Sequence, residues 1–290
     1  MSDSKQSKSI YENRWVRTVK LCLDKKFDEK IWWNRLHRSW CKRLLEIALR
    51  PIEAELRQEQ ENALAYLAEE PVFAFFYNRT PIHIYVPDYR VDLIQKDITM
   101  MQTFHEIELL QYIKAHYLHD GMVYLDCGAN IGNHTLFFAR AANAKRIFAF
   151  EGHPRTFSIL EKNIELNALQ SCVEAYNCVL GEKQGHAKIQ HEEPTNIGET
   201  SFCEDAEGDM KMICIDDMPW EEKVDFVKMD VEGFEYHVLR GMKNLLQSSQ
   251  PILWIESFPD KYPRVMNFLQ ETGYRQEHVL PGSNYIFVHQ

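Results

Sequence analysis

A short glycine-containing turn carries the first residues whose types and spacing suggest chemistry. The apolar stretch MVYL leads into Asp126-Cys127-Gly128-Ala129-Asn130-Ile131-Gly132, and the helical pattern NHTLFFARAANA follows at once. In an open parallel sheet, ligands bind where such a turn joins the end of a strand to the start of a helix. The G-x-x-x-G spacing lacks the G-x-G-x-x-G arrangement of dinucleotide sites, and the P-loop pattern with its lysine is absent. The turn therefore favours a nucleoside without phosphates.

A glutamate at the end of the next expected strand strengthens this interpretation. The segment RIFAFEG places Glu151 twenty-three residues after Gly128, where an acidic side chain accepts hydrogen bonds from two ribose hydroxyls. The third expected strand, VEAYNCVL, ends at Leu180, where apolar side chains would pack on an adenine. These positions predict a nucleoside site, and its candidate residues are Asp126, Gly128, Asn130, Gly132, Glu151 and Leu180.

Three carboxylates follow the fourth and fifth expected strands. VDFVKMD ends in Asp230, Glu232 follows two residues later, and ILWIES carries Glu256. The carboxyl ends of parallel strands meet at one edge, so these groups should converge beside the nucleoside site. A buried carboxylate with a raised pKa can act as a general base towards a hydroxyl. Converging carboxylates can also hold Mg²⁺; we predict Asp230, Glu232 and Glu256 as catalytic residues and no essential metal, with Mg²⁺ as the less favoured alternative.

Two further residues near these strand ends are interpreted as structural. Lys228 and Glu235 are expected to form an ion pair or to be simple surface groups. Helix capping and a solvated sheet edge are the structural alternatives for the three carboxylates themselves.

Several short motifs occur in a fixed order over residues 100–290. They are DCGANIG (126–132), FEGHP (150–154) followed by Asn163 and Asn167, Leu180-Gly181, IDD (215–217), and VKMDVEGFE (227–235) with Gly241. In type and order they resemble the FkbM-type family of class I S-adenosylmethionine (SAM) methyltransferases. The resemblance implies a seven-stranded sheet, SAM as methyl donor and, most often, O-methylation of sugars or other natural-product hydroxyls.

The resemblance adds one site residue and shows one departure. Glu106, in TFHEIELL, stands where family members carry a similar glutamate near the cofactor. Family members usually have proline directly after the ribose-binding glutamate, whereas here Gly152 and His153 precede Pro154. The loop under the ribose is therefore expected to have a different shape.

The alternation of apolar segments sets the expected organisation. From residue 101 the chain alternates strand, helix and strand, as in a sheet covered by helices on both faces. We predict an α/β, Rossmann-like domain of seven mainly parallel strands over residues 81–290, and a mostly helical basic extension over residues 1–80. PIHIYVP (81–87) is expected to be an edge strand. The polar stretch 191–209 is expected to form short strands or a loop near the site.

Charge is distributed unevenly along the chain. Residues 1–50 hold thirteen Lys and Arg against six Asp and Glu, and the other 240 residues carry a net charge of −17. An acidic body argues against binding nucleic acid, because phosphates require a basic face. Residues 31–50 predict an amphipathic basic helix. Such a helix packs on its own domain or contacts an anionic membrane surface or a partner, and both interpretations remain open.

Composition bounds the cellular setting and the competing functions. No run of eighteen apolar residues is present, and MSDSKQSKSI lacks the apolar core of a signal peptide, so the expected location is the cytoplasm, with peripheral membrane contact as an option. Seven scattered cysteines without a C-x-x-C pair favour free thiols over zinc. A nicotinamide-dependent oxidoreductase and a non-catalytic binding module are the alternatives to a methyltransferase.

Overall fold

The computed structural model describes residues 70–193 and 195–290. The amphipathic helix expected over residues 31–50 lies outside these residues. So does most of the extension expected over residues 1–80, and the division at residue 80 stays a prediction. Among the described residues, no helix is long and apolar enough to cross a membrane.

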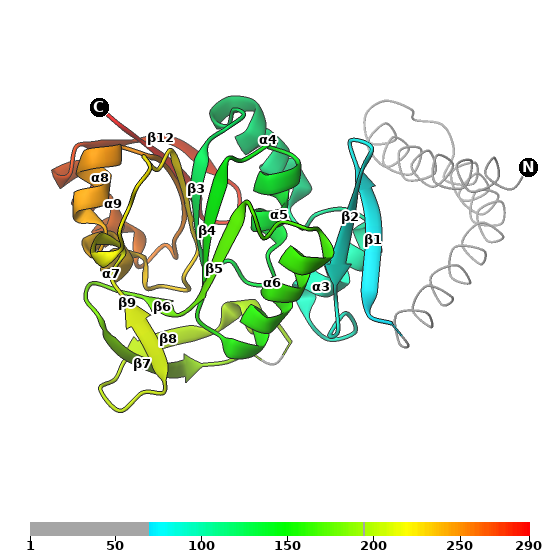
Figure 1. The fold of residues 1–290 in the computed structure, drawn as a ribbon. Coiled ribbons are helices and arrows are strands. Elements are labelled where there is room, and N and C mark those ends of the chain that lie inside the picture. Colours follow the sequence, from blue (N-terminus) through cyan, green and yellow to red (C-terminus); the bar gives the residue numbers. More distant parts are fainter. Residues whose placement is uncertain (1–69, 194) are drawn as a thin grey trace, which may run out of the picture. The chain divides into compact units, whose positions relative to one another are not determined.

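A seven-stranded sheet forms the centre of the described structure (Figure 1). Its order is β12-β13-β11-β10-β3-β4-β5. The strands from β11 to β5 are parallel to their neighbours, whereas β13 runs antiparallel to both β11 and β12. This is the predicted mainly parallel sheet. Its strands are β3 (Val123–Cys127), β4 (Arg146–Glu151), β5 (Val173–Asn177), β10 (Phe226–Met229), β11 (Ile252–Glu256), β12 (Tyr274–Leu280) and β13 (Asn284–His289).

Helices cover both faces of this sheet, so its central strands are buried on both sides. Successive side chains of a strand point to opposite faces, and Tyr124 and Leu125 of β3 accordingly belong to two different apolar cores. The first core includes side chains of α4 (Ile107–Tyr117), α5 (Asn133–Arg140) and α6 (Pro154–Leu166). The second core includes side chains of α7 (Glu235–Arg240), α8 (Lys243–Ser249) and α9 (Tyr262–Glu271).

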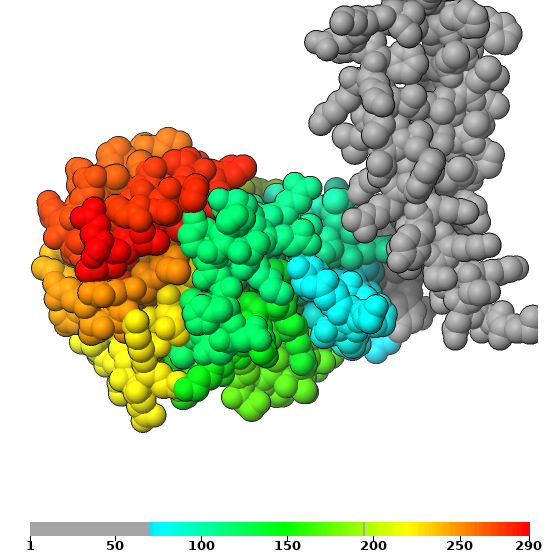
Figure 2. Space-filling model, turned by 90° about the horizontal axis from the view of Figure 1, so that it is seen from above, coloured from blue at the N-terminus to red at the C-terminus, as the bar shows by residue number. Residues whose placement is uncertain are grey.

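The strand predicted at residues 81–87 is confirmed as β2 (Thr80–Tyr85). It pairs with β1 (Val72–Tyr77) in a separate two-stranded sheet. In Figure 2 this hairpin, in cyan, lies at the opposite end of the described residues from the red C-terminal strands. A short helix, α3 (Leu93–Met101), follows, and the Asp92 side chain caps it by accepting from the Gln95 amide.

Two buried asparagines of α6 attach the hairpin to the main sheet. The Asn163 side chain accepts a hydrogen bond from the Tyr85 amide and donates one to the Ile131 carbonyl, over 2.5 and 2.7 Å. The Asn167 side chain accepts from the His83 amide and donates to the His83 carbonyl. The motif asparagines therefore act as hydrogen-bonding partners for an otherwise open strand edge.

A second, four-stranded sheet is inserted between β5 and β10. Its order is β6-β9-β7-β8, from β6 (Val179–Leu180), β7 (Gly185–His191), β8 (Ser201–Glu204) and β9 (Met210–Ile213). The prediction of short strands in the polar stretch is confirmed. The single strand predicted for VEAYNCVL is wrong, because the chain leaves the main sheet after Asn177 and Val179–Leu180 pair with β9 instead.

Candidate functional site

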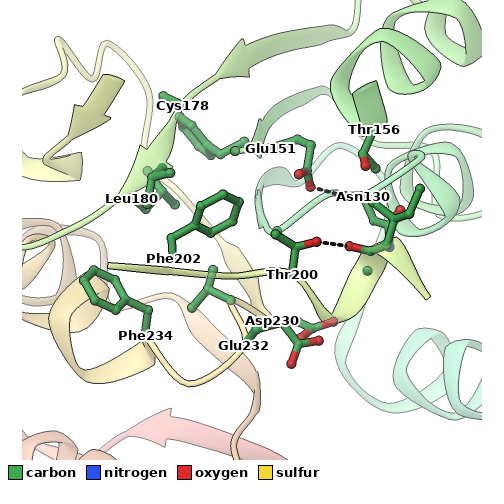
Figure 3. A pocket seen from close by; sticks show the side chains of 17 residues that line it. Asn130, Glu151, Thr156, Cys178, Leu180, Thr200, Phe202, Asp230, Glu232 and Phe234 are labelled. Carbon is green, nitrogen blue, oxygen red and sulfur yellow. Dashed lines mark hydrogen bonds between the residues drawn. The ribbon is translucent and has the colours of Figure 1, made fainter. Parts of the chain in front are cut away.

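A pocket lies over the carboxyl ends of β3, β4 and β10 (Figure 3). Its volume is about 50 Å³. The turn after β3, the end of β4, the segment around β6, the segment leading into β8 and the loop after β10 all contribute to it. The lining residues are Gly128, Asn130, Phe150, Glu151, Gly152, Thr156, Cys178, Val179, Leu180, Ile197, Gly198, Thr200, Phe202, Asp230, Val231, Glu232 and Phe234.

Glu151 ends β4 inside this pocket, and two backbone amides hold its carboxylate. The Asn130 amide donates to Oε2 over 2.8 Å, and the His153 amide donates to Oε1 over 2.7 Å. Burial raises the pKa of Glu151 to about 7, although these two hydrogen bonds act in the opposite direction. Each oxygen retains a second lone pair, so the carboxylate can still accept hydrogen bonds from a ligand.

The loop after Glu151 leads directly into α6. Pro154 is the first residue of α6 and His153 is its N-cap. The His153 amide therefore contacts Glu151 from the start of this helix. The different loop shape expected from the position of the proline stays a prediction.

The predicted nucleoside residues divide into two groups. Gly128, Asn130, Glu151 and Leu180 line the pocket together. Asp126 and Gly132 do not: the Asp126 side chain is fully buried and accepts from the Thr135 hydroxyl over 2.6 Å. Burial also raises the pKa of Asp126. A role of Asp126 and Gly132 in ligand binding stays a prediction. Neither residue lines the pocket, and both support the turn that does.

Gly132 and Glu106 support the same region from other elements. A β-carbon on Gly132, whose φ is +91°, would lie 2.7 Å from Leu160 Cδ1, so glycine is required for close packing there. Glu106 precedes α4, and its Oε2 lies 4.0 Å from Nε2 of the buried His134. Neither residue is among those that line the pocket.

Two of the three predicted catalytic carboxylates line the pocket. Asp230 and Glu232 are among its residues, whereas Glu256, at the end of β11, is not. Burial first, and then the charges of Asp230 and Glu256, raise the pKa of Glu232 to about 8. Burial and Asp230 likewise raise the pKa of Glu256 to about 8. The charge of Asp230 thus contributes to both shifts, and the catalytic role of the three carboxylates stays a prediction.

Lys228 is the cation beneath this acidic cluster. Only 3% of the residue is exposed, and its Nζ donates to the Gly128 carbonyl over 3.1 Å and to Asp230 Oδ2 over 3.2 Å. Burial opposes its charge, but Asp230, Asp126 and Glu256 outweigh burial and raise the pKa of Lys228. The interpretation of Lys228 and Glu235 as an ion pair or as surface groups is wrong, because both are buried and Lys228 pairs with Asp230 instead. Glu235 is buried and accepts from the Gly233 amide, because its side chain turns back over the start of α7.

A second cavity, of about 560 Å³, adjoins the first. Glu232, Phe202 and Phe234 line both. Its other residues come from β7, β8, the start of α7 and the start of α9. They are Gln190, His191, Ser201, Cys203, Gly233, Glu235, Tyr236, His237, Phe258, Lys261, Arg264 and Val265.

Several lining residues carry no clear sequence signal. Thr200 and Phe202 lie in the polar stretch expected to come near the site, but nothing in their spacing marks them. Lys261 and Arg264 lie at the start of an ordinary amphipathic helix. Within residues 70–193 and 195–290, no group of three or more His, Cys, Asp or Glu side chains is arranged to hold a metal ion.

Comparison with known protein families assigns the chain. A profile of the methyltransferase FkbM domain matches residues 126–276, which is more than half of the sequence and includes Glu151, Asp230 and Glu232. The chain belongs to the FkbM methyltransferase family. The matched range runs from the end of β3 into β12, so it contains most of the main sheet and the whole inserted sheet.

Individual relatives match a similar region. Methyltransferase 1 of Beauveria bassiana is 29% identical over 148 residues, which cover 42% of this chain and 59% of that protein. Hexuronic acid methyltransferase AglP of Haloferax volcanii is 32% identical over 126 residues, covering 42% of this chain and 51% of that protein. The chain thus spans between half and three fifths of the length of these relatives.

Solved structures are also similar. The crystal structure of methyltransferase FkbM from Methylobacillus flagellatus KT has a TM-score of 0.48 at 16% identity, over 68% of this chain and 52% of that one.

Proposed function

We propose that this FkbM-family protein transfers a methyl group from SAM to a hydroxyl oxygen on a saccharide or a related small molecule. One observation carries the proposal: Glu232, with its raised pKa, lines both the Glu151 pocket and the larger second cavity. A carboxylate between a donor site and an acceptor site can remove the proton of an incoming hydroxyl.

The chemistry of the small pocket fits the nucleoside part of SAM. Glu151 provides free lone pairs for ribose hydroxyls. On one side of it lie the apolar side chains of Phe150, Val179 and Leu180, which suit an adenine ring. We expect SAM to bind to these residues at the ends of β4 and β6. Its methionine part should then lie towards Asp230.

The pocket must widen before it can hold such a ligand. Its 50 Å³ is well below the roughly 300–1,000 Å³ of small-molecule sites. The Phe202 ring points into it between Leu180 and Thr200 (Figure 3), and a β-carbon on Gly152 would lie 2.9 Å from that ring. Phe202, on the short strand β8, is therefore the side chain that we expect to move on binding.

The acceptor chemistry rests on Glu232. SAM, when bound, supplies a methyl carbon whose bond to sulfur breaks with its electron pair remaining on sulfur. The protein's contribution is to take the proton as the acceptor oxygen forms its bond to carbon, and the Glu232 carboxylate is placed to accept it. Asp230 is held by Lys228 and is the second carboxylate at this point. Without such a base, a neutral hydroxyl is a poor nucleophile.

The acceptor class is supported by the name of one relative and by the size of the second cavity. AglP is named as a hexuronic acid methyltransferase, and a cavity of about 560 Å³ is within the range of small-molecule sites. We also propose that the acceptor is not a nucleic acid, that the protein acts in the cytoplasm, and that residues 31–50 provide any membrane or partner contact.

A calorimetric titration tests the donor. SAM, S-adenosylhomocysteine and NAD are titrated into the wild type and into Glu151→Ala. The loss of a charge-assisted contact to the ribose should cost about 1.5–3 kcal/mol, which is roughly ten- to a hundredfold in affinity. Glu161→Ala is the matched control, because Glu161 is exposed on α6.

The outcomes separate the competing functions. Micromolar binding of SAM and its product, lost only in Glu151→Ala, supports the methyltransferase. Binding of NAD in their place would indicate the oxidoreductase. If none of the three binds to folded protein, the non-catalytic binding module becomes the better hypothesis.

A further inference from the structure

The second cavity has two cationic side chains on one wall. Lys261 and Arg264 lie three residues apart at the start of α9, and both are exposed and line the cavity. Within the described part of the chain, neither forms a salt bridge with a carboxylate, whereas other cations such as Arg240 and Arg275 do. Two positive charges that no carboxylate of the described residues pairs with thus line the cavity next to Glu232.

The two cations are held close to the point where the cavities meet. Lys261 Cε lies 3.9 Å from the position that a β-carbon on Gly233 would take, and Gly233 directly follows Glu232. The Arg264 guanidinium lies over the Tyr236 ring, 3.7 Å from its centre. Stacking on a ring restricts the guanidinium, so less freedom is lost when it binds an anion.

The remaining groups of the cavity do not neutralise these charges. Glu235 is directed to the Gly233 amide and, more distantly, to the Ser257 hydroxyl. Burial, and then the neighbouring Arg264, lower the pKa of His237, so it adds no positive charge at neutral pH. His191 is the other histidine on the lining. Glu232 is the other acidic group on the lining, and it also lines the smaller pocket.

Aromatic surfaces complete the cavity. The Phe258 side chain is 47% exposed, and its ring edge lies 3.7 Å from the same Gly233 position. Phe234 stacks on His237, with ring centres 4.6 Å apart, and lines both cavities. Flat apolar faces beside polar groups suit a ring that carries hydroxyls and C–H faces.

We propose that the second cavity binds an anionic saccharide, whose carboxylate or phosphate pairs with Lys261 and Arg264 while a ring hydroxyl faces Glu232. The proposal rests on the proposed function, because it assigns the acceptor for the same transfer. It also divides the roles along the cavity. The cations at α9 select and orient the acceptor, and the glutamate at the shared boundary acts on its hydroxyl.

The test compares three matched sugars that differ only at carbon 6. Methyl β-glucoside, its 6-carboxylate (methyl β-glucuronide) and its 6-phosphate are titrated by NMR into protein saturated with S-adenosylhomocysteine. We expect at least one of the two anionic sugars to bind ten or more times more tightly than the neutral one. We expect Lys261→Met with Arg264→Met to remove that preference. Lys243→Met, at an exposed position on α8 away from the cavity, should preserve it.

The outcomes distinguish this proposal from the function on which it rests. A protein that does not bind S-adenosylhomocysteine refutes the proposed function, and the acceptor assignment with it. A protein that binds it but shows no preference for either anionic sugar refutes the acceptor assignment alone. The same holds if the preference survives the double substitution. A preference for the carboxylate over the phosphate, or the reverse, identifies which anion the site takes. Because Arg264 packs on Tyr236, the single variant Lys261→Met, which should reduce the preference, is measured as well.

Discussion

The Lys228 ammonium lies 3.2 Å from the Asp230 carboxylate, and both belong to the strand end that faces the candidate site. In the sheet register Lys228 is also the neighbour of Asp126 on β3. Lys228 thus connects a fully buried aspartate with one that lines the pocket. Among the described residues, it is the only cation within hydrogen-bonding distance of the Asp230 carboxylate.

Replacing this lysine should destabilise the protein strongly. Lys228→Met removes the salt-bridge partner of Asp230 and the positive charge that opposes the effect of burial on Asp126. Breaking a buried pair in this way costs about 3–5 kcal/mol. Urea unfolding at constant pH measures the change. Lys223→Met, at an exposed position just before the same strand, should change stability by less than about 0.5 kcal/mol. Equal, small changes for both variants would show that Lys228 has no role in holding the cluster.

The activity should depend on the ionisation of Glu232. A general base must be deprotonated, and the pKa of Glu232 is raised to about 8. The turnover rate should therefore rise about tenfold per pH unit below pH 8 and level off above it. Glu232→Gln should lower the rate by roughly a hundred- to ten-thousandfold and leave SAM affinity unchanged. Initial rates with an acceptor that the wild type methylates test this, and a Gln variant that retains full activity would exclude Glu232 as the base.

Glu256 should influence the reaction only through Glu232. Its charge contributes to the raised pKa of Glu232, and it does not line the pocket. Glu256→Gln should therefore shift the midpoint of the pH–rate profile below 8 while the plateau rate stays within about threefold of wild type. The profile of this variant is the measurement. A hundredfold loss on the plateau would instead make Glu256 the base and contradict the assignment to Glu232.

The central strands β3, β10 and β11 could be predicted because each is a short, mainly apolar run. Val123–Cys127 and Phe226–Met229 are buried along their length, and such runs indicate a sheet covered on both faces. The same rule failed at residues 173–180. The division of that run into two strands depends on the pairing of Val179 with Met212, a contact that is distant in sequence.

The sequence predicted those residues of the candidate site that lie at strand ends. The prediction failed for residues that other elements contribute. Gly128, Glu151, Asp230 and Glu232 come together because they follow neighbouring parallel strands. Phe202 reaches the pocket from an inserted sheet whose position no local pattern encodes. Lys228 was interpreted as a pair or surface group because a lysine in a strand usually faces solvent. Lys228 lies instead beside the fully buried Asp126 in the sheet register, and the negative charge of that residue favours a buried lysine.

The two motif asparagines should differ in their effect on the cofactor site. Asn163→Ala leaves the Tyr85 amide and the Ile131 carbonyl without their partner. The loss of these buried hydrogen bonds should destabilise the protein by about 2–4 kcal/mol, measured by urea unfolding. Because Ile131 belongs to the turn that also contains Asn130, SAM affinity should fall several-fold as well. Asn167→Ala is the matched control, since its side chain bonds to His83 on the hairpin and not to the turn. It should destabilise the protein comparably and leave SAM affinity unchanged, and equal losses of affinity in the two variants would refute the link between Asn163 and the site.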